Sequence, residues 1–221
     1  MELSGAKLTL ETTVIATGLL LAVLYYVWRW ANWQRLRESS EHNVVLGAVV
    51  FMMVIWTIRT EIQPGVVWHL SGMVTLTLMF GWSLAIVAGL LALIGITIAG
   101  LNDLAGLPLT ALLHIVLPAS LAMIILGLSR AWLPKHFFVF VFVNAFFASG
   151  LIVVLTVLTS TLVMVALGSL QWSDASGSYL EVLPLMLFPE AVFNGWNIAM
   201  LAALRPQWLW TFNDAEYIEG K

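Results

Sequence analysis

Seven long apolar segments constrain the fold more than any other feature of the chain. They cover residues 13–30, 44–60, 66–82, 83–100, 110–128, 137–167 and 179–204. A helix needs about 20 mostly apolar residues to cross a bilayer, whereas a spanning strand alternates apolar and polar residues. The stretch "GLLLAVLYYVW" does not alternate in this way. We therefore predict an all-α integral membrane protein with about seven transmembrane helices in one domain, 1–221.

The composition agrees with this class and excludes several others. Charged residues make up only 10% of the chain, against roughly 25% in soluble domains. The net charge of −3 argues against a nucleic-acid partner. Because there is no cysteine, any metal would be held by imidazole, carboxylate, thioether or backbone groups. Membrane lipid is the first partner that we expect.

The positions of the basic residues indicate the topology. Lys and Arg are retained on the cytoplasmic side of short loops. With seven spans and the N-terminus outside, seven of the nine basic residues lie inside, whereas a sixth segment split into two helices near residues 149–150 would leave five inside. We therefore expect seven spans, an outside N-terminus and a cytoplasmic C-terminus. The boundary between the third and fourth segments is placed at "FGWS".

Two histidines lie within the predicted spans, where ionisable residues usually face the interior of a helix bundle. His69, Met73 and Thr77 are spaced i, i+4, i+8 and would share one face of a helix. An imidazole beside a thioether suits a late transition metal. Alternatively, His69 lies at the mouth of the span and makes one hydrogen bond. His114 is a second candidate ligand, unless it satisfies a carbonyl freed by Pro118.

Glu190 is the only acidic residue deep inside a predicted span. It lies on one helical stripe with Asn194 and Asn197, at i, i+4 and i+7. The stripe would either line a cation path or hold neighbouring helices together by hydrogen bonds. We weigh the two roles equally for Glu190 and favour the structural role for the asparagines.

Motifs of soluble enzymes are absent from the sequence. It contains no Walker A sequence, GxGxxG, HExxH, GxSxG or CxxC. We therefore predict that the protein is not an enzyme. Any active transport would need another subunit to hydrolyse ATP.

Two stretches resemble the membrane-embedded substrate-binding subunits, or S components, of energy-coupling-factor transporters for cobalt and nickel. The first is "HLSG" at 69–72 with the later Phe80-Gly81 pair, and the second carries Glu190, Asn194 and Arg205. The resemblance implies seven helices, location in the bacterial inner membrane, separate ATPase subunits and His69 as a metal ligand. The chain departs from the family's Met-His start, since it begins Met1-Glu2.

The predicted function is the uptake of a divalent transition metal ion similar to cobalt or nickel. The metal would be the substrate, and we name no resident cofactor. Its candidate ligands are His69, Glu190, His114 and Met73, with the N-terminal amine as a further donor. The first alternative is a structural or assembly subunit of a larger membrane complex that has lost the metal site. The second is a b-haem electron carrier that uses His69 and His114.

Overall fold

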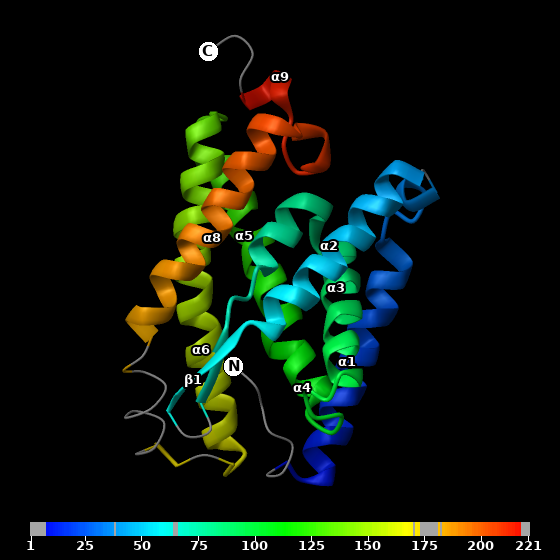
Figure 1. The fold of residues 1–221 in the computed structure, drawn as a ribbon, viewed down its shortest axis with the longest axis vertical. Helices are drawn as coiled ribbons and strands as arrows, with labels where there is room; N and C mark the ends of the chain where they lie inside the picture. Colours follow the sequence, from blue (N-terminus) through cyan, green and yellow to red (C-terminus); the bar gives the residue numbers. More distant parts are fainter. Residues whose placement is uncertain are drawn as a thin grey trace.

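The computed structural model describes residues 8–37, 39–63, 66–169, 171–172, 181 and 183–217. Helices dominate this part of the chain (Figure 1). The elements in order are α1 (Leu10–Trp30), η2 (Arg35–Arg37), α2 (Ser39–Thr57), β1 (Arg59–Gln63), β2 (Val66–His69), α3 (Met73–Ile98), α4 (Leu107–Ala111), η3 (Leu112–Val116), α5 (Leu117–Trp132), η4 (Val139–Phe147), α6 (Ala148–Ala166), α8 (Leu183–Leu204), η6 (Pro206–Trp208) and α9 (Asp214–Tyr217).

By length and composition alone, five of the described helices could cross a membrane. They are α1, α2, α3, the continuous helix Leu107–Trp132 formed by α4, η3 and α5, and the continuous helix Val139–Ala166 formed by η4 and α6. The prediction of an all-α integral membrane protein is therefore confirmed. The sixth apolar segment is one helix and is not broken near residues 149–150.

The helix α3 folds back on itself at Gly81. This residue has φ 73° and ψ 176°, a region open almost only to glycine. The Sδ atom of Met73 lies 3.1 Å from the position that a Cβ atom on Gly89 would take, although a straight helix would separate these residues by about 24 Å. The third and fourth apolar segments are thus two arms of α3, and the boundary predicted at "FGWS" is confirmed.

The first arm of α3, residues 73–80, does not cross the membrane alone. Eight residues of helix are about 12 Å long, and the hydrocarbon core is about 30 Å thick. The arm begins inside the protein, after the β1–β2 hairpin, and ends at the turn. It is therefore a re-entrant helix buried among its neighbours.

The segment after α8 forms hydrogen bonds with the C-terminal end of this arm. The amide of Trp210 donates to the carbonyl of Met79 at 2.8 Å, and the Oγ1 hydroxyl of Thr211 donates to the carbonyl of Leu78 at 2.6 Å. The last carbonyls of a helix have no partner within the helix. Arg130 of α5 in turn donates to the carbonyl of Thr211. The C-terminal segment therefore supplies the hydrogen bonds that the kink removes.

A two-stranded antiparallel hairpin precedes α3, and it corrects one prediction. His69 is the last residue of β2 and pairs with Arg59 across the hairpin. The helix starts only after Gly72, whose φ of +64° ends the extended backbone. The prediction that His69 and Met73 share a helical face is therefore wrong. A short apolar run such as residues 66–68 fits a strand as well as a helix.

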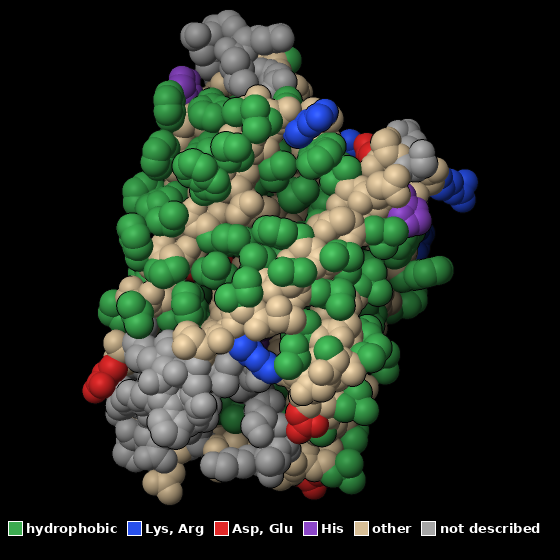
Figure 2. Space-filling model, viewed as in Figure 1, with side chains coloured by type: hydrophobic (Ala, Val, Ile, Leu, Met, Phe, Trp, Pro, Cys, Tyr) green, Lys and Arg blue, Asp and Glu red, His purple; other side chains and the backbone are tan. Residues whose placement is uncertain are grey.

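The two arms of α3 lie at the centre of the bundle, and the outer helices are exposed. In the most apolar stretch of α3, 61% of the residues are buried, whereas 17% are buried in the most apolar stretch of α1. Apolar side chains cover the visible outer surface of the helices (Figure 2). Such a surface suits lipid, because hydrocarbon tails are as apolar as the side chains.

Candidate metal-binding site

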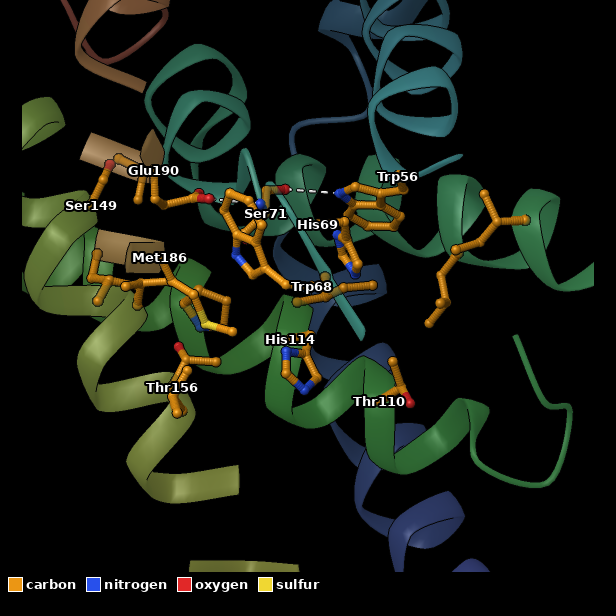
Figure 3. A pocket seen from close by; sticks show the side chains of 18 of the residues that line it. Trp56, Trp68, His69, Ser71, Thr110, His114, Ser149, Thr156, Met186 and Glu190 are labelled. Carbon is orange, nitrogen blue, oxygen red and sulfur yellow. Dashed lines mark hydrogen bonds between the residues drawn. The ribbon is translucent and has the colours of Figure 1, made fainter. Parts of the chain in front are cut away.

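A cavity of about 50 Å³ lies beside the start of α3. Side chains from α2, β2, α3, η3, α6 and α8 line it (Figure 3). One water molecule needs roughly 10–15 Å³ of such space, so the cavity has the size of a small ion with a few waters. Its polar lining residues are Trp56, Trp68, His69, Ser71, Asn102, Thr110, His114, Ser149, Thr156 and Glu190.

Glu190 caps the start of α3 from another helix. Its carboxylate accepts hydrogen bonds from the backbone amides of Ser71, at 2.8 Å, and Gly72, at 3.0 Å. The side chain is only 2% exposed. The first four amides of a helix have no partner within the helix, and a negative charge near them is stabilising. Glu190 therefore fixes the backbone two and three residues after His69.

Asn194 extends this contact by one turn of α8. Its Oδ1 atom accepts from both the amide and the hydroxyl of Thr75, at 2.9 and 2.8 Å. Its Nδ2 group donates to Glu190 Oε1 at 2.9 Å. The structural role predicted for Asn194 is confirmed. Asn197 instead donates to the carbonyl of Phe193 in its own helix.

His69 lies at the end of β2, four residues before the re-entrant arm begins at Met73. Its Nδ1 atom lies 3.1 Å from the carbonyl oxygen of Leu70, and its ring centroid lies 5.8 Å from that of Trp56. Trp56 also donates from Nε1 to the carbonyl of Ser71 at 3.0 Å. His69 is outside the membrane-spanning helices, and burial lowers the pKa of its imidazole to about 3. The ring is therefore neutral at neutral pH, the state that can coordinate a metal.

His114 reaches the same cavity from η3. Its Nε2 atom is buried and has no hydrogen-bond partner among the described residues. The same is true of Trp68 Nε1, Thr110 Oγ1 and Thr156 Oγ1, which also belong to lining residues. Buried polar groups normally have a partner, so four such atoms around one cavity indicate a polar occupant. Figure 3 shows His69 and His114 directed toward this common space.

Met73, predicted as a ligand, does not line the cavity. Its side chain is fully buried and packs against Gly89 in the other arm of α3. Among the residues that the structure describes, no three His, Asp or Glu side chains are arranged to hold a metal ion. The N-terminal amine lies outside the described residues. The cavity therefore brings together His69, His114 and Glu190 from the predicted set, without Met73.

The haem hypothesis is not supported by the size of the cavity. Sites for larger organic ligands usually measure about 300–1,000 Å³, and this cavity measures about 50 Å³. Its lining also contains residues that the sequence analysis did not single out, above all Trp56, Trp68 and Thr156. Trp68 could have been found from its place beside His69, whereas Thr156 carries no signal in the sequence.

A family comparison identifies the class of the protein. The family described as CbiM, cobalt uptake substrate-specific transmembrane region, matches residues 3–208. The chain belongs to the CbiM family. No curated protein and no solved structure matches the chain. As a CbiM protein it is a membrane component of cobalt uptake, and the matched region includes every residue that lines the cavity.

Proposed function

We propose that this CbiM protein is a substrate-binding subunit that takes up a divalent transition metal ion through the cavity beside α3. The observation that carries the proposal is the buried Nε2 atom of His114, which has no partner in the described part of the chain and belongs to a wall that His69 also lines. Two neutral imidazoles suit Co²⁺, Ni²⁺, Cu²⁺ and Zn²⁺. The metal is the substrate here and not a resident cofactor.

The proposed roles of the three ionisable residues differ. His69 and His114 are the ligands, and water or further donors complete the coordination. Glu190 holds the backbone of Ser71 and Gly72, because its oxygens already accept hydrogen bonds from these amides. It is therefore a positioning residue that keeps His69 at the cavity.

The energy for uptake would come from other subunits. The sequence contains no Walker A motif, so we propose that separate ATPase subunits of the energy-coupling-factor type drive transport. The proposed location is the bacterial inner membrane, with the N-terminus outside and the C-terminus in the cytoplasm. The distribution of basic residues supports this orientation.

Titration calorimetry with CoCl₂ or NiCl₂ on protein in lipid nanodiscs tests the proposal. We expect one saturable site in the wild type, loss of binding in His69→Ala and at least about tenfold weaker binding in His114→Gln. His42→Ala is the matched control, because this exposed histidine lies at the start of α2. Thermal unfolding of each variant shows whether the fold is retained.

The alternative function is that of a structural subunit without a metal site. The observation that favours it is the lack, among the described residues, of three clustered His, Asp or Glu side chains in an arrangement for a metal. The same titration separates the two functions. Absence of saturable binding by the wild type, or equal binding by the wild type and both cavity variants, would replace our proposal with the structural one.

A further inference from the structure

A second hollow in the molecule lies on the outer surface and is distinct from the cavity. It is a groove of about 740 Å³ between α2 and α8, with the first arm of α3 as its floor. The face between these helices carries mainly apolar side chains (Figure 2). The volume lies within the range of about 300–1,000 Å³ that ligand sites have. The groove therefore has room for a small amphiphile.

The walls of the groove are apolar along most of its length. Gly47 of α2 contributes to the hollow, since a Cβ atom there would meet no atom within 4 Å. Phe51 of α2 and Phe193 of α8 stack with ring centroids 6.3 Å apart and join the two walls. Met79 and Leu76 belong to the floor. Such a surface fits a hydrocarbon chain, and Thr75 and Asn197 are the polar side chains along this part of the lining.

One end of the groove is polar and positively charged. Arg205 directly follows the last residue of α8, and its guanidinium lies 5.8 Å from the ring centroid of Trp208. Ser40 and Asn43, from the first turns of α2, line the same groove. Tryptophan and arginine at a helix end are typical of the headgroup level of a membrane. Among the described residues, no acidic side chain forms an ion pair with Arg205.

We propose that this groove binds an anionic phospholipid. One acyl chain lies between α2 and α8, and the phosphate lies on the guanidinium of Arg205. Arginine recognises a phosphate through parallel hydrogen bonds, and the adjacent apolar groove binds the acyl chain of the lipid. The positive end of the groove favours an anionic lipid as its occupant. A helix of a partner subunit, about 10–12 Å across with its side chains, would need more room than a groove of this volume offers. The inference is independent of the metal site.

Native mass spectrometry of the delipidated full-length protein in detergent tests the proposal. The protein is titrated in parallel with phosphatidylglycerol and phosphatidylcholine of identical acyl chains. We expect phosphatidylglycerol to bind at least about fivefold more tightly at the first site, because one arginine near an anionic surface contributes about this factor. Arg205→Gln should remove the preference. Gly47→Leu, which fills the groove, should weaken binding of both lipids at that site.

Two matched controls separate the groove from the general lipid-facing surface. Arg29→Gln removes a basic residue that also lies beside a tryptophan at a helix end, 5.7 Å from the ring centroid of Trp30. Gly18→Leu adds a side chain in open space on α1. Both controls should keep the preference for phosphatidylglycerol. The proposal is overturned if Arg205→Gln keeps the preference, or if Gly47→Leu retains both lipids. If Gly47→Leu also loses a protein partner that co-purifies from native membranes, the groove belongs to that partner instead.

Discussion

The carboxylate of Glu190 accepts a hydrogen bond from the backbone amide of Gly72 at 3.0 Å, across 118 residues of sequence. Gly72 is the residue that directly precedes α3. This contact joins α8 to the short segment 70–72 that follows His69. The geometry of the cavity therefore depends on a residue that belongs to a different helix.

Replacing Glu190 with Ala should destabilise the protein strongly. The amides of Ser71 and Gly72 would both lose their acceptor, and an unsatisfied buried donor costs about 1–3 kcal/mol. We expect a loss of about 2–6 kcal/mol in the free energy of unfolding, measured by thermal unfolding in detergent. Glu11→Ala is the control, since Glu11 is exposed in the first turn of α1. Equal stability of the two variants would contradict the capping role.

Replacing Gly81 with Ala should destabilise the turn within α3. No atom lies within 4 Å of the added Cβ, so the effect would come from the backbone conformation alone, at about 1–3 kcal/mol. Gly127 of α5 also has open space but helical geometry, so Gly127→Ala should instead stabilise by about 0.5–1 kcal/mol. Opposite shifts in the melting temperature of the two variants would confirm the prediction, and parallel shifts would contradict it.

Metal binding should be insensitive to mild acid. An imidazole with an ordinary pKa near 6.5 would be about 97% protonated at pH 5 and would lose about 30-fold in apparent affinity. Burial lowers the pKa of His69 to about 3, so its ring stays neutral between pH 7 and pH 5. We expect the affinity for Co²⁺ to change less than about threefold over this interval. Titrations at pH 7, 6 and 5 check this, and a steep fall near pH 6.5 would show a solvated ligand.

Reporter fusions should place the C-terminus and residues 173–178 on opposite sides of the membrane. A reporter that is active only in the cytoplasm should work when it is fused after Lys221, because seven of nine basic residues lie inside in this orientation. The same reporter within residues 173–178 should be silent. The reverse pattern would contradict the proposed orientation.

The sequence predicts the apolar segments well because hydrophobicity is a local property. The turn at Gly81 and the stripe of Glu190 and Asn194 also follow from neighbouring residues. The hairpin does not, since residues 66–69 are short and apolar in either conformation. The partners of Glu190 were not predictable either, because a hydrogen bond between residues 118 positions apart depends on the packing of the whole bundle.

The re-entrant arm of α3 has a consequence for biosynthesis. The two ends of this arm are stabilised by hydrogen bonds with Glu190, Asn194, Trp210 and Thr211. At roughly 5–20 residues per second, the ribosome needs about 6–24 s after Gly72 before it adds the first of these residues. During that interval the arm lacks these partners. These hydrogen bonds therefore form late in membrane insertion, and translation must pass residue 211 before both ends of the arm can be bound.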